Sequence, residues 1–264
     1  MFIAHAFLDR NELFGEEEDL ETARSACDFI LNRLTIMEDS TGICFSYTPL
    51  DRRQVHNANM LGASLLARVA RITGESHLQL HSRRAASFSM TRQNADGSWP
   101  YGVGDAENWI DNFHTGLVLV SLLEYMQYSQ DREFEDNLNR GYSFWKSAFF
   151  SADGQPMYYP GKLYPIDTHS VAQAMLTFAA FSGRDPEAAD RALRLARWGC
   201  ANMQDEAGCF HYQIGRYMRN RIPYIRWSQA WMFRALAECC LAAKGQSSQK
   251  LDAELERKDH DYAH

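Results

Sequence analysis

The chain has 264 residues, of which 45% are hydrophobic and 12% aromatic, a composition typical of one large globular domain or two small ones. Its 34 acidic and 27 basic residues give a formal net charge of −7, and the basic residues are scattered, so we expect neither a nucleic-acid partner nor an electrostatically held membrane surface. The first ten residues, MFIAHAFLDR, lack a basic segment and reach Asp9 too early for a signal peptide or a membrane span, which predicts a cytoplasmic protein without a transmembrane segment.

Three elements follow one another in the first part of the chain. The segment 21–34 has apolar side chains at steps of three and four residues, which predicts a helix with one face in water. A polar turn with a glycine follows at 39–47, and the run 59–69 is apolar on nearly all sides, which is typical of a helix that is buried all round. The same elements recur three times: amphipathic helices at 77–93, 134–150 and 190–204, glycine turns at 94–101, 151–159 and 205–213, and apolar helices at 114–125, 169–181 and 227–243.

The turn glycines set the period of this repeat. They are Gly42, Gly97, Gly154 and Gly208, so they recur every 55 residues or so. Each follows a polar turn residue and precedes an aromatic side chain, so we expect the glycine to supply a positive φ and the aromatic ring to cover the end of the inner helices. Antiparallel pairs of this kind stack side by side into a ring or horseshoe.

The predicted fold is therefore all-α. We expect an α/α toroid of about four helical hairpins, with an inner and an outer layer of helices and an incomplete or small ring, over residues 1–246. Residues 247–264 are polar and charged and are predicted to form an exposed C-terminal tail.

Two of the turns carry a motif that other proteins share. QNADGSW at 93–99 resembles the glutamine, glycine and tryptophan repeat of the terpenoid cyclases, and QDEAGCF at 204–210 resembles it with Phe210 in place of the tryptophan. The repeats as a whole, over 20–245, are similar to the α/α-toroid superfamily, which includes terpenoid cyclases, protein prenyltransferase β subunits, polysaccharide lyases, epimerases and glycosidases. Complete toroids of these families often have six or seven hairpins, so the resemblance implies a ring that is small, open or closed by a partner chain, such as a second copy in a homo-oligomer.

Polar residues gather where the four apolar helices begin. Because all inner helices run in the same direction, we expect these residues to converge on one rim, where four helix N-termini favour an anionic ligand. Helix capping alone would account for Asp111, Asp167 or Asn57, and a lone histidine is more often structural than catalytic. Titratable groups at matched positions favour a functional site instead. The matched positions are Asn59, His114, His169 and Trp227, preceded by His56, Asn57, Asp111, Asn112, Asp167, Tyr224 and Arg226.

The first chemistry that fits this rim acts on glycans. Arg226 and the helix N-termini would neutralise the carboxylate of a uronic acid, which lowers the barrier to removal of the adjacent C5 proton by His114 or His169, with a tyrosine as the acid. Lyase elimination or epimerisation would result, whereas hydrolysis would use Asp111 and Asp167 as acid and base. The candidate catalytic residues are His114, His169, Asp111, Asp167 and Tyr158, and the candidate substrate contacts are His56, Asn57, Asn59, Asn112, Trp109, Tyr164, Tyr224, Arg226, Trp227 and Gln229.

Further resemblances support this class. IRWSQAWMFRAL at 225–236 resembles the Arg-Gly-Gln-Ala-Trp helix start of unsaturated glucuronyl hydrolases at Gln229, Ala230 and Trp231, although one extra residue turns Arg226 by about 100° around the helix. The order of DNFHTG, PIDTHS and RWSQAW is most similar to toroid proteins that accompany bacterial surface-polysaccharide synthesis. These resemblances imply a carbohydrate-active enzyme of bacterial polysaccharide metabolism whose partner is an acidic glycan or glycoconjugate.

Two alternatives remain open. DNFHT at 111–115 resembles the Asp-x-x-His-Thr stretch of protein prenyltransferase β subunits, which would make His114, Asp167 and His169 a zinc site; otherwise no cofactor is expected. The zinc-binding cysteine of that family is absent, the repeats occur in the reverse order, and the Asp-x-Asp-Asp acid of terpenoid cyclases is missing. The second alternative is a non-catalytic protein that binds a glycan or lipid, or assists assembly, at the same rim.

Overall fold

The computed structural model describes residues 1–244, so the tail predicted at 247–264 lies outside the described residues. The chain divides between Phe149 and Phe150 into two compact units. Unit 1 contains α1 (Phe2–Phe14), α2 (Glu17–Arg33), β1 (Ile36–Asp39), β2 (Gly42–Phe45), α3 (His56–Thr73), α4 (Ser76–Met90), the 3-10 turn η1 (Asp105–Glu107), α5 (Asn112–Ser129) and α6 (Glu135–Ala148). Unit 2 contains β3 (Ile166–Asp167), α7 (Thr168–Ala180), α8 (Ala188–Met203), β4 (Gln213–Ile214), β5 (Arg219–Asn220), the π-helical turn η2 (Ile225–Gln229) and a helix at 230–244.

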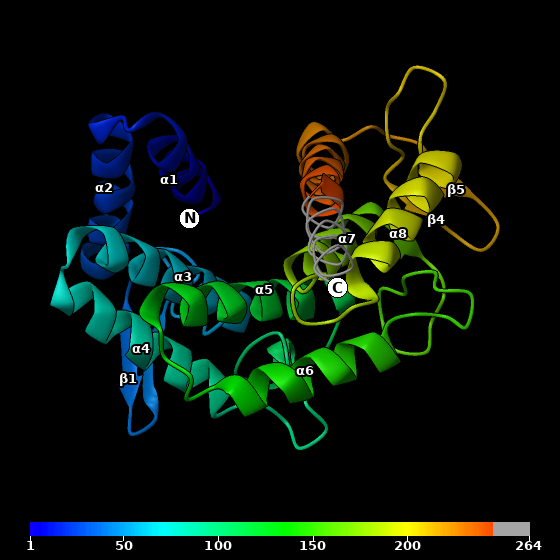
Figure 1. Cartoon of the computed structure of the whole chain (residues 1–264). Coiled ribbons are helices and arrows are strands. Elements are labelled where there is room, and N and C mark those ends of the chain that lie inside the picture. The colour runs from blue at the N-terminus through cyan, green and yellow to red at the C-terminus, as the bar shows by residue number, and fades with distance from the viewer. Residues whose placement is uncertain (245–264) are drawn as a thin grey trace, which may run out of the picture. The chain divides into compact units, whose positions relative to one another are not determined.

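The core of unit 1 forms around the two apolar helices α3 and α5, which lie side by side (Figure 1). Leu65 of α3 and Leu119 of α5 are fully buried, and the outer helix α4 covers α3. In unit 2 the outer helix α8 packs against the apolar helix α7. The prediction of alternating amphipathic and apolar helices is confirmed for α2 to α8.

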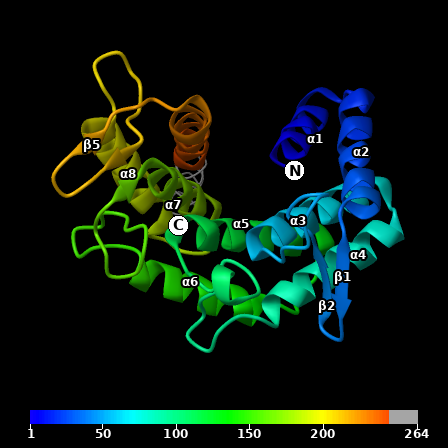
Figure 2. The same cartoon turned by 180° about the vertical axis from the view of Figure 1, so that it is seen from behind.

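Short strands accompany the helices at the turns, which the all-α prediction did not include. The strands β1 and β2 pair as an antiparallel hairpin whose second strand packs on α4 (Figure 2). In unit 2, β3, β4 and β5 form an antiparallel sheet in that order, with Asp167 opposite Gln213. The paired backbones satisfy the amide groups of the connections between outer and inner helices.

The repeated turn has one hydrogen-bond pattern in three of its copies. The amide of the glycine donates to the carbonyl three residues earlier, from Gly97 to Asn94 at 3.0 Å, from Gly154 to Ser151 at 2.8 Å and from Gly208 to Asp205 at 3.0 Å. The glutamines of the two motif copies close the turn, because Gln93 Nε2 donates to the Gly97 carbonyl and Gln204 Nε2 to the Gly208 carbonyl, both at 2.9 Å. All four turn glycines have positive φ angles, as predicted: Gly42, Gly97, Gly154 and Gly208.

Gly97 also has no room for a side chain. A Cβ atom at this position would lie 2.5 Å from the carbonyl oxygen of Arg140 in α6, so the turn rests directly on the backbone of the next outer helix. Trp99, which follows in the same turn, is buried against Gly141 and donates from Nε1 to the Ser89 carbonyl at 3.1 Å. The aromatic residue is therefore buried, as the sequence predicts, and these contacts join it to the outer helices α4 and α6.

The helix α1 precedes the repeats and was not predicted. Its Ala4 and Leu8 are buried, and Arg68 of α3 holds it by ion pairs from Nη2 to Asp9 at 2.7 Å and to Glu12 at 2.9 Å. Because Arg68 itself is buried, these pairs fix the position of α1 on α3.

The last apolar helix differs from its prediction. We expected the run 227–243 to be buried on all sides, but Phe233 is 78% and Leu241 63% exposed. Burial is confined to one stripe at steps of three and four residues, with Met232 of that stripe against Gly199 of α8. The helix is therefore half-buried within the described residues.

The close approach of Gly97 predicts an unequal response to two alanine substitutions. Gly97→Ala should lower the free energy of unfolding by about 3 kcal/mol, because it combines a positive φ with a clash against backbone. Gly74→Ala, where φ is 76° and no atom lies within 4 Å, should cost only about 1 kcal/mol. Urea unfolding followed by circular dichroism measures both, and equal losses would contradict the packing of this turn.

Candidate functional site

The start of α5 carries a coupled aspartate and histidine. Asp111 is the N-cap residue of α5, and its Oδ1 atom accepts a hydrogen bond from the His114 amide at 2.8 Å. Its other oxygen, Oδ2, lies 2.7 Å from Nδ1 of the His114 ring. Because a carboxylate only accepts hydrogen bonds, Nδ1 carries the hydrogen, and the neutral ring then has Nε2 free to accept a proton.

Aromatic rings hold the imidazole of His114 in place. Tyr101, Trp109 and Phe113 meet it edge to face at centroid distances of 4.7, 5.3 and 5.0 Å. Tyr101 in turn stacks on Trp109 at 4.3 Å. Asp111 is fully buried, whereas the His114 side chain keeps 21% of its surface exposed, so the imidazole is the part of the pair that a ligand can reach.

The start of α3 brings a second histidine to the same place. His56 is buried, and its Nδ1 atom lies 3.3 Å from the hydroxyl of Ser89. That hydroxyl already accepts a hydrogen bond from Asn59 Nδ2 at 3.1 Å, so it can give its own hydrogen to His56. This arrangement makes Nδ1 the acceptor and leaves Nε2–H as a donor.

Two polar atoms of this second group have no protein partner. Within residues 1–244, neither His56 Nε2 nor Asn57 Oδ1 makes a hydrogen bond, although both atoms are buried. Burial, with a smaller contribution from the charge of Arg92, lowers the pKa of His56 to about 4, so the ring is neutral at pH 7. His56 Nε2 and Asn57 Oδ1 therefore offer one neutral donor and one acceptor to a ligand.

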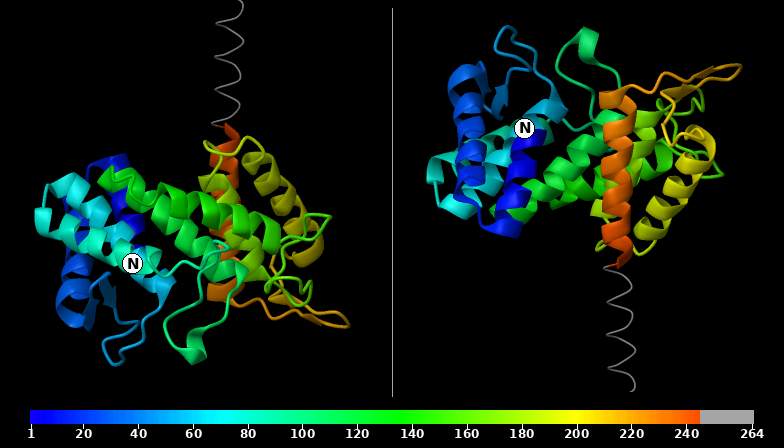
Figure 3. Two further views of the ribbon diagram at one scale, coloured as in Figure 1. Left: turned by 90° about the horizontal axis from the view of Figure 1, so that it is seen from below. Right: turned by 90° about the horizontal axis from the view of Figure 1, so that it is seen from above.

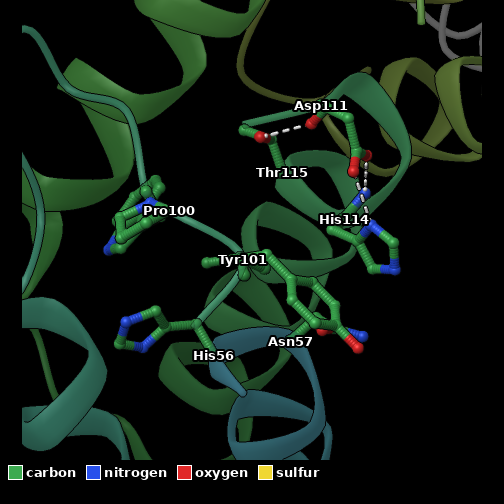
Figure 4. A pocket seen from close by; sticks show the side chains of 9 residues that line it. His56, Asn57, Pro100, Tyr101, Asp111, His114 and Thr115 are labelled. Carbon is green, nitrogen blue, oxygen red and sulfur yellow. Dashed lines mark hydrogen bonds and ion pairs between the residues drawn. The ribbon is translucent and has the colours of Figure 1, made fainter. Parts of the chain in front are cut away.

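These residues surround a small pocket in unit 1, which Figure 4 shows from close by. The helix α3 begins here without a side-chain cap, so its partial positive charge is available to an anion. Arg53 brings a cation close to the lining: its guanidinium lies 6.0 Å from the centroid of the Tyr101 ring, and its Nε atom lies 3.4 Å from Glu107. The pocket is lined by His56, Asn57, Trp99, Pro100, Tyr101, Asp111, His114, Thr115 and Val118.

Unit 2 repeats the aspartate and histidine with a looser geometry. Asp167 is the N-cap residue of α7 and accepts from the His169 amide at 2.8 Å, but its Oδ1 atom is 4.0 Å from Nδ1 of the His169 ring. Its Oδ2 atom accepts from Gln213 Nε2 at 3.1 Å. Burial and the charge of Asp167 raise the pKa of Tyr212. Asp167 is thus bonded to Gln213 of the neighbouring strand β4, and it lies farther from its imidazole than Asp111 does from His114.

Aromatic side chains surround His169. Its ring meets Trp231 edge to face at 5.7 Å and Trp227 at 6.4 Å. Tyr224 lies 5.5 Å from Trp227 and 5.1 Å from Tyr212. The guanidinium of Arg226 stands 5.5 Å over the Trp227 ring, so this cluster combines stacking surfaces with a cation.

Three amide side chains that were predicted to contact substrate form hydrogen bonds within the protein instead. Asn59 is buried and uses its amide on Phe45, Ala85 and Ser89. Asn112 accepts from Trp145 Nε1 at 2.8 Å, and Gln229 bonds both backbone atoms of Phe210. These three amides lie outside the lining of the pocket.

The predicted tyrosine differs from the one in the pocket. Tyr158 and Tyr164 belong to unit 2, and the Tyr158 ring packs on Tyr159 at 4.8 Å. Tyr101 lines the pocket of unit 1 instead. Its position two residues after Trp99, at the end of the repeated glycine turn, was the signal in the sequence that could have identified it. The expectation that the His114 and His169 clusters share one rim concerns both units and stays a prediction.

The described part of the chain offers no clustered metal ligands. Within residues 1–244, no three histidine, cysteine, aspartate or glutamate side chains are grouped so that they could hold a metal ion. The zinc ligands of the prenyltransferase alternative belong to both units, His114 to unit 1 and Asp167 and His169 to unit 2. No helix in the described range has the length and apolarity that crossing a bilayer requires.

Solved structures resemble most of this chain. A cellobiose 2-epimerase from Bacillus thermoamylovorans superposes with a TM-score of 0.69 at 11% identity, over 90% of this chain and 72% of that one. The Lin0763 protein from Listeria innocua gives 0.71 at 14% identity, over 93% and 71%. An unsaturated glucuronyl hydrolase gives 0.64 at 14% identity, over 89% and 71%. This chain has the α/α-toroid fold. No protein-family model and no curated protein matches the sequence.

The neutral His56 predicts how stability depends on pH. A histidine in the unfolded chain takes up a proton near pH 6.5, whereas His56 in the folded chain does so only near pH 4, so the unfolded state binds more protons between these values. The free energy of unfolding should therefore fall by up to about 3 kcal/mol more in the wild type than in His56→Gln as the pH is lowered from 7 to 4. Denaturant titrations at several pH values measure this, with the exposed His77→Gln as control. Parallel curves for wild type and His56→Gln would contradict the buried neutral ring.

Proposed function

We propose that this protein is a carbohydrate-active enzyme that moves a proton on an acidic sugar, by epimerisation or by lyase elimination. The hydrogen-bonded pair of Asp111 and His114 is the main support for this reaction. The Asp111 and His114 pair leaves Nε2 of the imidazole as an acceptor beside a pocket whose wall holds the unpaired His56 Nε2 and Asn57 Oδ1. The fold agrees, because structures with it include a cellobiose 2-epimerase and a sugar epimerase from a ruminal bacterium.

His114 is the proposed base. Its Nε2 atom would take the proton from the carbon next to the carboxylate, and Asp111 would stabilise the imidazolium that forms. The aromatic rings around His114 keep the imidazole from turning away. For epimerisation the Tyr101 phenol would deliver a different proton to the opposite face of the carbon, and solvent would then restore the protons of His114 and Tyr101. For lyase elimination the leaving oxygen would depart with the Tyr101 proton as the new double bond forms, and His114 would keep the proton from the carbon until solvent removes it.

Tyr101 and His56 are the proposed donors. Burial raises the pKa of Tyr101, so its phenol keeps its proton at pH 7 and can give it to a departing or developing oxyanion. The Nε2–H group of the neutral His56 would donate to the sugar without adding charge. Among the tyrosines, Tyr101 takes the role that the sequence suggested for Tyr158.

An acidic substrate is favoured by the charge around the pocket. The uncapped start of α3 and the guanidinium of Arg53 both attract a carboxylate. An unsaturated glucuronyl hydrolase whose structure contains dGlcA-Glc-Rha-Glc also has this fold. Together with the resemblance of the helix starts, this supports a role in bacterial polysaccharide metabolism.

Hydrolysis fits the pocket less well. A glycosidase needs a carboxyl group that can protonate the leaving oxygen. Among residues 1–244, Asp111 is the only carboxylate in the pocket lining. It is buried, and both of its oxygens are bonded to His114. The residue is therefore built to hold the imidazole.

Asp111→Asn separates helix capping from proton transfer. An asparagine can still accept from the His114 amide, so the free energy of unfolding should change by less than about 1 kcal/mol. Its NH2 group cannot accept from Nδ1–H, so the imidazole loses the tautomer that leaves Nε2 basic, and turnover should fall at least 100-fold. Urea unfolding and initial rates measure the two effects; a variant with unchanged rates would rule out the base assignment.

Exchange with heavy water tests the reaction. Uronic-acid oligosaccharides and neutral reducing disaccharides are incubated with the protein in heavy water, and deuterium at the carbon next to the carboxylate or carbonyl is followed by NMR, with ultraviolet absorption for an unsaturated product. We expect one of these signals with an acidic sugar and its loss in His114→Ala. His77→Ala, an exposed histidine on α4, is the control that should keep full activity. Binding of the sugars without either signal would favour the non-catalytic binding alternative.

A further inference from the structure

One part of unit 2 has a charge opposite to that of the whole chain. Between residues 207 and 237 the sequence contains five arginines and no aspartate or glutamate, although the net charge of the protein is −7. Four of these arginines lie within eleven residues, namely Arg216, Arg219, Arg221 and Arg226. All four are exposed, and none forms an ion pair with any of residues 1–244. Their charge is therefore available to a partner.

The structure presents these arginines on a projecting hairpin. The strands β4 and β5 pair with Gln213 opposite Asn220 and Ile214 opposite Arg219, and the amide of Gly215 donates to the Met218 carbonyl at 2.8 Å. This closes a tip of four residues, 215–218. Figure 3 shows the hairpin as a narrow loop that extends away from the helices of its own unit. A glycine is required at the tip, because a Cβ on Gly215 would lie 2.9 Å from the Met218 oxygen.

Large apolar side chains share this hairpin with the arginines. At the tip, Tyr217 is 88% and Met218 79% exposed. After β5, Ile222 and Ile225, the first residue of η2, are exposed as well. The Arg216 guanidinium lies 5.3 Å over the Tyr217 ring. Exposure of these apolar side chains to water is unfavourable. An apolar tip next to arginines instead suits the boundary between lipid headgroups and acyl chains.

We propose that the hairpin 213–226, which we term the basic hairpin, docks the protein on a membrane surface that contains anionic lipids. The guanidinium groups would pair with lipid phosphates, while Tyr217 and Met218 insert among the headgroups. A soluble acidic glycan would also attract the arginines, but it offers no apolar surface to methionine and isoleucine side chains. The overall composition predicted no membrane surface, because a charge averaged over 264 residues hides a local reversal. The proposal is independent of the chemistry in unit 1.

Vesicle binding of the full chain tests this inference. Sedimentation with vesicles of phosphatidylcholine alone and of phosphatidylcholine with phosphatidylglycerol should show binding only to the second, and binding should weaken as salt is raised. Arg216→Gln with Arg221→Gln should weaken partitioning about 30-fold, because each arginine near an anionic surface contributes about a factor of five. Tyr217→Ser with Met218→Ser should weaken it about 10-fold or more.

Matched variants in unit 1 serve as controls. Arg52→Gln with Arg71→Gln makes the same change of net charge at exposed positions, and Leu50→Ser removes an apolar side chain that is 97% exposed. Both should bind vesicles like the wild type, and circular dichroism checks that every variant is folded. Equal partitioning to both vesicle types, or no partitioning, would overturn the proposal. Loss of binding in the arginine variant with full binding in the Tyr217 and Met218 variant would identify a general polyanion site instead.

Discussion

The contact between a glycine turn and the backbone of the next outer helix positions the pocket of unit 1. Gly97 rests on the Arg140 carbonyl of α6, and in the copy before it Gly42 rests on Arg84 of α4. Since no side chain separates the turn from the helix, the residues after each glycine start from a fixed point. Trp99 and Tyr101 follow Gly97, and the Tyr101 carbonyl accepts from the His56 amide at 3.0 Å. The turn thereby joins the beginnings of α3 and α5 and creates the pocket between them.

The spacing between cap and histidine distinguishes the two units. In unit 1 the histidine is three residues after the cap, which is the position whose side chain reaches back to the N-cap residue, and the Asp111 to His114 ring distance is 2.7 Å. In unit 2 the histidine is two residues after the cap, its ring points elsewhere on the turn, and the distance grows to 4.0 Å. The sequences DNFHT and IDTHS look alike, yet a difference of one residue gives the first pair the shorter distance between carboxylate and ring. This is why the proposed base is His114.

The sequence predicted the features that repeat and missed those that depend on a single contact. Helix type and turn position follow from periodicity and from glycine, so α2 to α8 and the positive φ of Gly97 were accessible. The amide of Asn59 is fully hydrogen-bonded by β2 and α4. These bonds depend on how the elements pack together, which no sequence pattern reveals. Phe233 was expected inside because the helix reads as apolar, but hydrophobicity does not tell whether a neighbouring helix exists to cover it. The basic hairpin was missed because charge was averaged over the whole chain.

The first turn of α3 shows how a structural amide differs from a functional one. Asn59 is one turn away from His56 and satisfies its buried amide completely, whereas His56 Nε2 and Asn57 Oδ1 are buried without a partner among residues 1–244. Each such atom costs about 1 to 3 kcal/mol of stability. A framework position would replace these side chains by apolar ones, as the neighbouring Met60 and Leu61 illustrate. The two unpaired atoms are best understood as hydrogen-bonding groups held ready for a polar ligand, and both line the pocket that His114 faces.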